Sequence, residues 1–115
     1  MATAHYDMDY ECKACKVSGL NIDFSSATWQ CGSCQASIFI KIEHNGLRFT
    51  VRRLRPSFVH IGSEVRLDSF ALGTFQKVLR KTMLKGGVYA LTIAKHTRAE
   101  YDSSERITVL FKRGW

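Results

Sequence analysis

The chain has 115 residues, 45% of them hydrophobic, which is enough for a compact folded protein and excludes gross disorder. No apolar run approaches the roughly 20 residues that a membrane-spanning helix needs, so we expect no membrane association. Seventeen Lys and Arg against ten Asp and Glu give a formal net charge of +7, which favours a polyanionic partner.

The first eleven residues have no apolar stretch of the kind found in a secretory signal. They carry Asp7, Asp9 and Glu11 instead. We therefore expect an intracellular protein, cytoplasmic or, if its ligand is DNA, nucleoid or nuclear. In such a compartment thiols stay reduced and are free to bind a metal ion.

The next feature along the chain is a set of four cysteines in two pairs, and the chain has no others: Cys12, Cys15, Cys31 and Cys34. Two C-x2-C pairs separated by fifteen residues have the spacing of a four-thiolate zinc site. Zinc prefers tetrahedral coordination, and four protein ligands leave no position open for water or substrate. We therefore predict one structural Zn²⁺.

Disulfides and a redox-active thiol pair are the alternatives for these cysteines. A redox pair usually occurs once, beside a strand-to-helix junction, whereas this chain has two copies. Disulfides would suit a secreted protein, for which the N-terminal residues give no indication. Both alternatives are less favoured than zinc.

Residues from about Tyr10 to Phe39 resemble the zinc-ribbon class, in which two cysteine knuckles clamp short antiparallel strands around one ion. The resemblance implies that all four cysteines are ligands. Gly32 fits the preference of this class for small residues inside a knuckle, whereas Lys13 and Ala14 make the first knuckle less typical. Zinc ribbons serve many processes, so the resemblance indicates a metal site and says little about function.

Beyond the second knuckle the sequence predicts a β-hairpin. Residues 36–43 alternate, with Ile38, Ile40 and Ile42 on one face. Asn45-Gly46 is a strong signal for a two-residue hairpin turn, and residues 47–54 form the predicted return strand. The hairpin continues directly from the predicted ribbon, without a flexible linker.

Short strands are predicted at residues 58–61 and 64–67. Asp68 or Ser69 would then cap an amphipathic helix that runs to about Lys85 and ends at Gly86-Gly87. Its apolar side, at helical spacing, would consist of Leu72, Phe75, Val78, Leu79 and Met83. Strands at residues 88–95 and 107–111, with a polar loop at 101–105 between them, would complete the fold.

These elements predict an α+β fold, in which an N-terminal zinc ribbon is continuous with a mostly antiparallel sheet that carries one principal amphipathic helix. The predicted domains are residues 1–43, the ribbon, and residues 44–115, a basic α+β body. We expect the two to pack as one compact unit.

Positive charge is concentrated in the middle of the chain: residues 1–40 sum to −2, residues 41–99 to +9 and residues 100–115 to zero. The densest group has four arginines in eight residues with no acid among them: Arg48, Arg52, Arg53 and Arg55. Strand alternation predicts that Arg48 and Arg52 share an exposed face about 13 Å apart, a spacing that suits separate phosphates.

The predicted helix contributes a second basic group: Lys77, Arg80, Lys81 and Lys85. For this group taken alone, a solvated helix face explains the charges better than a phosphate-binding role does. Lysines near a helix C-terminus also complement the helix dipole.

The sequence gives little support for catalysis. Its histidines are scattered, at positions 5, 44, 60 and 96. It has no phosphate-binding glycine loop, nucleophile elbow or zinc-protease motif. We therefore expect a protein that is not an enzyme.

Our interpretation is a small zinc-ribbon protein that binds nucleic acid through its basic residues, mainly by phosphate contacts. Because such contacts position a ligand without identifying its bases, we expect little sequence preference. The alternative is a protein-binding adaptor or inhibitor that docks its basic face on an acidic or nucleic-acid-binding surface of a larger complex. The sequence leaves open DNA versus RNA and the oligomeric state.

Overall fold

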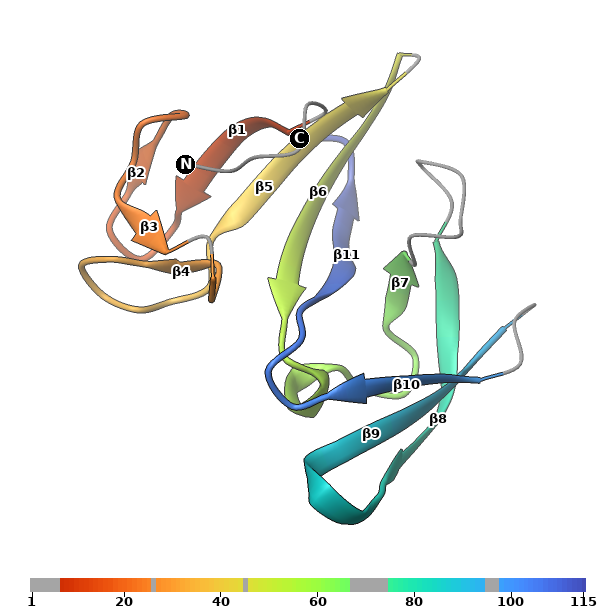
Figure 1. Cartoon of the computed structure of the whole chain (residues 1–115). Helices are drawn as coiled ribbons and strands as arrows, with labels where there is room; N and C mark the ends of the chain where they lie inside the picture. Colours follow the sequence, from red (N-terminus) through yellow and green to blue (C-terminus); the bar gives the residue numbers. More distant parts are fainter. Residues whose placement is uncertain (1–6, 26, 45, 67–74, 95–97) are drawn as a thin grey trace. The chain divides into compact units, whose positions relative to one another are not determined.

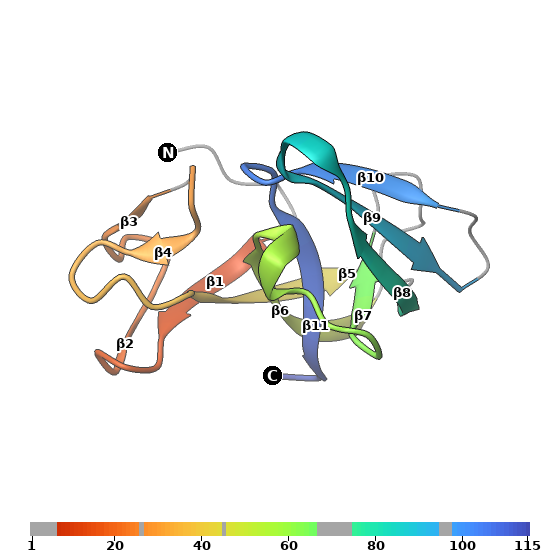
Figure 2. The same cartoon turned by 90° about the horizontal axis from the view of Figure 1, so that it is seen from below.

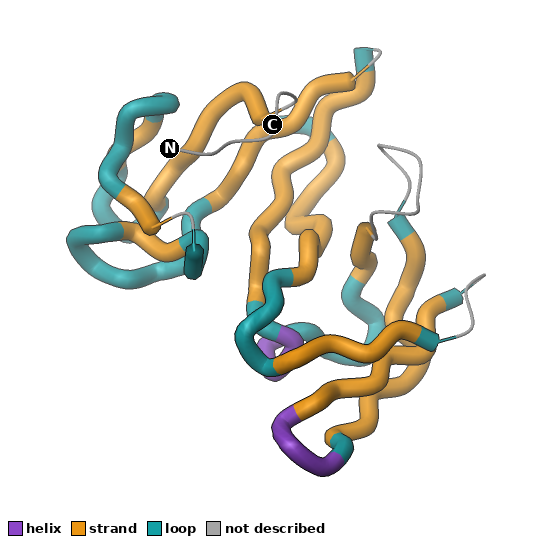
Figure 3. The backbone as a smooth tube through the Cα atoms, in the orientation of Figure 1, coloured by secondary structure: helices purple, strands orange, loops and turns teal. Residues whose placement is uncertain are grey.

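The computed structural model describes residues 7–25, 27–44, 46–66, 75–94 and 98–115. In these residues strands dominate, and the helical segments are two short 3-10 turns, η1 (Pro56–Phe58) and η2 (Lys85–Gly87) (Figure 3). The chain divides into two compact units. Unit 1 comprises Met1–Arg53 and Leu110–Trp115, and unit 2 comprises Leu54–Val109.

Unit 1 is built from antiparallel strands, with hydrogen-bonded order β2-β1-β5-β6-β11 and a separate pair β3-β4 (Figure 1). In chain order these strands are β1 (Asp7–Cys12), β2 (Val17–Ser18), β3 (Phe24–Ser25), β4 (Gln30–Cys31), β5 (Phe39–His44), β6 (Leu47–Leu54) and the second half of β11 (Ile107–Arg113).

The predicted hairpin is confirmed as β5 and β6, and its alternation builds the core of unit 1. Ile38, Ile40 and Ile42 are all buried. Ile40 lies opposite Val51, and Ile42 lies opposite Phe49. The pairing of His44 with Leu47 shows that two residues connect the strands; Gly46 among them has a φ of 78°, the left-handed conformation that glycine favours. The other, Asn45, lies outside the described residues.

Unit 2 is also antiparallel, with strand order β11-β7-β8-β9-β10 (Figure 2). Besides the first half of β11, its strands are β7 (Glu64–Arg66), β8 (Gln76–Met83), β9 (Val88–Ile93) and β10 (Ala99–Asp102). Its core is a cluster of branched aliphatic side chains from these strands and the adjoining segments: Leu54, Val59, Val65, Val78, Leu91, Ile93, Ile107 and Val109.

The predicted principal helix, and with it the α+β class, is wrong: the described part of the chain is nearly all β. Residues 76–83, in the C-terminal half of that predicted helix, form strand β8 and pair with β9. Gly86 and Gly87, interpreted as a helix stop, have φ angles of 76° and 75° and connect the two strands. The predicted cap and the N-terminal part of the predicted helix, residues 68–74, lie outside the described residues.

A β-bulge explains why β8 has the apolar spacing of a helix. Val78 pairs with Ile93 and Arg80 pairs with Thr92, so β8 advances two residues while β9 advances one. The extra residue is Leu79, whose side chain is 56% exposed, whereas Val78 is 1% exposed. The bulge interrupts the strict alternation of a strand, and the resulting pattern resembles a helical period.

Several shorter predictions can also be compared with the structure. The predicted strand at residues 58–61 is wrong, because η1 and a turn occupy that segment. The predicted polar loop at residues 101–105 begins as strand β10, which extends to Asp102. The strands predicted around β7, β9 and β11 are confirmed, with ends that differ by a few residues.

The predicted domain boundary, between residues 43 and 44, lies near the turn that joins β5 to β6. Both strands of this hairpin belong to unit 1, as far as Arg53. Unit 2 begins ten residues later, at Leu54. Within the described residues, no helical segment is long and apolar enough to cross a membrane.

Candidate metal centre and basic residues

The two cysteine pairs occupy equivalent places in unit 1. Cys12 is the last residue of β1 and Cys15 follows in the turn to β2, whereas Cys31 ends β4 and Cys34 lies in the next turn. The residue after each second cysteine has a left-handed backbone, with φ angles of 59° at Lys16 and 63° at Gln35. The two turns thus share this backbone feature at the same position, although neither residue there is glycine.

The four Sγ atoms converge, and all lie within 4.8 Å of one another. Cys12 Sγ is 3.4 Å from Cys34 Sγ, and Cys15 Sγ is 3.9 Å from Cys31 Sγ. Four sulfurs at the corners of a tetrahedron with metal–sulfur bonds of 2.3 Å would be about 3.8 Å apart. The structure therefore confirms that the four predicted ligands come together, in a geometry that could hold one metal ion.

Backbone N–H groups point at the sulfurs from within each turn. The N–H of Cys15 donates to Cys12 Sγ, and the N–H of Ser33 donates to Cys31 Sγ, both at 3.4 Å. Such bonds favour the thiolate form that a metal ion requires. For Cys31 the overall pKa is lowered, whereas for Cys12 the lowering by the N–H of Cys15 is outweighed by burial and the neighbouring thiols, which raise the pKa.

The cysteines differ in acidity as a result. Backbone N–H groups of Cys34 and Ser33 lower the pKa of the Cys31 thiol to about 6. Hydrogen bonds with the thiol groups of Cys34, Cys12 and Cys31 raise the pKa of Cys15 to about 12. Without a metal ion, the Cys31 side chain is therefore mostly ionised at neutral pH, whereas Cys15 stays protonated.

Gly32 has a steric role in the second turn. Its N–H donates to the carbonyl oxygen of Asp23 at 2.9 Å, and a Cβ at this position would collide with the Asp23 carboxylate. The small residue noted from the sequence is thus explained by the close approach of the neighbouring segment.

Arg53, predicted as a phosphate contact, is buried and bound inside unit 1. Its Nη1 and Nη2 atoms donate to the two carboxylate oxygens of Asp7, each at 2.9 Å. The Tyr10 hydroxyl donates to the same carboxylate, and the guanidinium lies 4.1 Å from the ring centre of Trp29. Arg53 therefore contributes to packing inside unit 1, and we leave it out of the proposed ligand contacts.

The other two predicted arginines of unit 1 lie nearer the surface. Arg48 is exposed and pairs with Glu43 at 3.1 Å, and its guanidinium lies over the ring of Trp115. Arg52 is half-buried, with its guanidinium over the rings of Phe39 and Phe111.

The remaining predicted basic residues belong to unit 2, and all of them except Arg55 lie on the strand and turn where a helix was expected. Arg55, Lys77, Arg80 and Lys85 are exposed. Lys81 is used internally, because its Nζ atom donates to the carbonyl oxygens of Ser57 and Val59, each at 3.0 Å. The predicted set is thus split between the two units.

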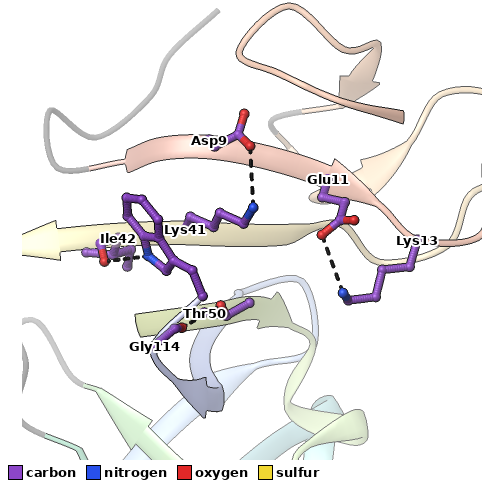
Figure 4. Close-up of polar contacts among 8 residues, drawn as sticks. Asp9, Glu11, Lys13, Lys41, Ile42, Thr50 and Gly114 are labelled. Atoms are coloured by element: carbon purple, nitrogen blue, oxygen red, sulfur yellow. Dashed lines mark hydrogen bonds and ion pairs between the residues drawn. The ribbon is translucent and has the colours of Figure 1, made fainter. Parts of the chain in front are cut away.

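Ion pairs on the sheet of unit 1 were not found by sequence reasoning. Figure 4 shows Lys41 beside Asp9 on adjacent strands, at 3.8 Å, and Lys13 beside Glu11, at 3.4 Å. The first pair follows from the β1–β5 register, in which Asp9 lies opposite Lys41. That register depends on long-range pairing, so no local sequence signal could have revealed it.

Comparisons of the chain with protein-family models, with curated proteins and with solved structures found no match. The function proposed below therefore depends on the cysteine cluster and on the charged and aromatic side chains of each unit.

Proposed function

We propose that the chain is a zinc protein that binds nucleic acid through contacts with phosphates. Zinc suits the cluster because it favours four thiolates in a tetrahedron, and four protein ligands make a structural site. The ion would link the β1–β2 turn to the turn that follows β4, whose cysteines are at least 16 residues apart in sequence. Its role would be to hold the fold of the N-terminal strands.

The observation that carries the nucleic-acid proposal is a surplus of cations without carboxylate partners. In unit 1 the acids Asp7, Asp9, Glu11 and Glu43 each pair with a cation. Within the described residues, five of the predicted basic residues have no ion pair: Arg52, Arg55, Lys77, Arg80 and Lys85. Unpaired cations on a protein of net charge +7 are available for phosphate oxygens.

The chemistry of these side chains fits phosphate better than bases. Arginine can hold a phosphate with two parallel hydrogen bonds, and lysine binds it as a point charge. Neither contact depends on sequence, so affinity should vary little with base composition and strongly with salt.

Fluorescence anisotropy of the zinc-loaded protein with labelled DNA and RNA, at increasing salt, tests this function. We expect binding that weakens steeply with salt. Replacing Lys77 and Arg80 with Ala should reduce the salt slope by about 1.5 to 2 released ions. The matched control replaces two paired cations, Lys41 and Arg48, and should change the slope less. Absence of binding even at low salt would refute the function.

Protein binding is the second candidate, and an apolar group in unit 2 favours it. Four large side chains there are highly exposed: Phe58, Ile61, Leu79 and Met83, at 58%, 66%, 56% and 70%. The hydrogen bonds from Lys81 of β8 to Ser57 and Val59 place β8 beside the segment of Phe58, and exposed apolar side chains on neighbouring segments can form an interaction surface. A pull-down before and after nuclease treatment separates the candidates, because a protein partner that survives nuclease supports an adaptor.

A further inference from the structure

A group of aromatic and cationic side chains lies on one sheet of unit 1. Phe39 begins β5, Arg52 is in β6 and Phe111 is in β11, three strands that are neighbours in the sheet; Lys13 follows β1. The two ring centres are 4.6 Å apart, with the planes at 69°. The Arg52 Cζ atom lies 5.5 Å and 5.7 Å from them, and Lys13 Nζ lies 4.9 Å and 5.9 Å away. We call these four residues the ring cluster.

The ring cluster is accessible from solvent. Phe111 is 45% exposed, which is unusual for a large aromatic side chain that has a neighbouring ring to pack against. The core of unit 1 is formed instead by aliphatic side chains such as Ile40 and Val51, which are both fully buried. The Phe111 ring is therefore held in place by its neighbours while part of it stays open to a ligand.

Within the described residues, Arg52 is the cation of the ring cluster that has no ion pair. Lys13 pairs with Glu11, as Figure 4 shows, and Lys41 and Arg48 also have carboxylate partners. Among the described residues Arg52 has no ion pair, and its Nε atom is buried without a hydrogen-bond acceptor. Its position over two rings is therefore not explained by internal hydrogen bonding, and its charge remains available to an external anion.

We propose that the ring cluster binds single-stranded nucleic acid, with an unpaired base stacked on Phe111 and a phosphate held by Arg52. The proposal rests on the function above and narrows its ligand to one class. Stacking on an aromatic side chain needs an open base face, which a duplex hides inside its own stack. A phosphate beside the base is a feature of every nucleotide in a strand.

Other ligand classes satisfy less of this geometry. A free anion or an acidic side chain would neutralise Arg52 but would leave the exposed Phe111 ring without a partner. A cationic ligand would be attracted to the rings but repelled by Arg52 and Lys13, which already lie over them. A nucleotide in a single strand supplies both a flat ring and a negative charge.

Anisotropy titrations of the zinc-loaded full chain with labelled strands of about 15 nucleotides test the proposal. The probes are single-stranded DNA, the same strand with abasic sites, the same sequence as RNA, and the duplex. We expect both single strands to bind at least tenfold more tightly than the duplex or the abasic strand. Phe111→Ala should weaken single-strand binding about tenfold and remove the difference between intact and abasic strands.

Three further variants make the result specific. Phe58→Ala removes a similarly exposed phenylalanine from unit 2 and should leave the single-strand preference unchanged. Phe111→Leu keeps an apolar side chain without an aromatic ring, so it replaces Phe111→Ala if that variant does not fold. Arg52→Gln should reduce the affinity for intact and abasic strands alike, because the phosphate is present in both.

The outcomes separate this proposal from the function on which it rests. Binding to duplex and single strand with equal affinity, or binding that Phe111→Leu does not change, overturns the ring-cluster site and leaves phosphate binding intact. Absence of binding to all four probes at low salt overturns both the ring-cluster site and the proposed phosphate-binding function.

Discussion

Asp7 and Arg53 form a bidentate ion pair inside unit 1, with side chains that are 0% and 10% exposed. The Tyr10 hydroxyl and the ring of Trp29 complete the surroundings of this pair. Charges taken out of water in this way are costly to separate, because removal of one partner leaves the other buried and unpaired.

Arg53→Ala should therefore lower the free energy of unfolding by about 3 to 5 kcal/mol, measured by urea denaturation of the zinc-loaded protein. Arg48→Ala is the matched control, since it removes an exposed pair with Glu43 and should cost less than about 1 kcal/mol. Equal effects of the two variants would contradict the buried pair.

The acidities of the cysteines make metal binding dependent on pH. The pKa of Cys31 is lowered to about 6, by backbone N–H groups of Cys34 and Ser33, so its thiolate is ready near neutral pH. Cys15 has a pKa raised to about 12 by the neighbouring thiol groups. For Cys12 the largest single influence is the hydrogen bond from the Cys15 N–H, which lowers the pKa. Burial and hydrogen bonds with Cys34 and Cys31 together raise it by more, so the pKa of Cys12 is raised overall.

Metal binding must therefore release at least the protons of Cys12 and Cys15. Since protons compete with the ion, affinity falls as pH falls, by at least about a hundredfold per unit near neutrality, and more steeply below about pH 6, where Cys31 also protonates. Zinc titrations against a competing chelator at several pH values measure this slope. An affinity that does not depend on pH would contradict thiolate ligation.

At the scale of elements, strand β8 is the clearest departure from local sequence pattern. Val78 and Leu79 would share the apolar side of a helix, whereas the bulge of β8 buries the first and exposes the second. The pattern of apolar residues in eight positions is too short to separate a bulged strand from a helix. Pairing with β9, which is non-local, decides the outcome.

The two side chains provide a test of this correction. Val78→Ala should cost about 2 kcal/mol of stability, because it leaves a cavity in the core of unit 2. Leu79→Ala should cost less than about 0.5 kcal/mol, as expected for an exposed position. Urea denaturation of both variants measures the contrast, and similar losses at both sites would favour the helix.

The sequence predicted well those features that depend on short-range chemistry. The alternation of Ile38, Ile40 and Ile42 and the turn beside Gly46 together specify the β5–β6 hairpin. The spacing of the four cysteines is sufficient to predict the cluster, because thiolates have few other reasons to occur in two such pairs.

Features that depend on tertiary contacts could not be predicted in the same way. Arg52 and Arg53 are adjacent in sequence, yet Arg52 lies over the rings of Phe39 and Phe111, whereas Arg53 is buried against Asp7, 46 residues away. Strand alternation requires that neighbours point to opposite faces, but the partner on each face comes from distant segments.

At the scale of the whole molecule, the positive charge is divided almost equally between the two units, in contrast to its concentration in the middle of the sequence. Unit 1 has eight Lys and Arg against five Asp and Glu, a net of +3, and unit 2 has nine against five, a net of +4. Zinc with four thiolates would carry a net charge of −2 and reduce unit 1 to about +1. Most of the excess positive charge of the metal-loaded protein would then be in unit 2, where Lys77 and Arg80 are exposed.

The most direct test of the account is native mass spectrometry of the chain, purified without chelators or added metal. We predict one zinc ion per chain, lost on acidification and absent when Cys12 and Cys34 are both replaced by Ser. A metal-free chain whose mass has dropped by the hydrogens lost in disulfide formation would contradict the metal centre.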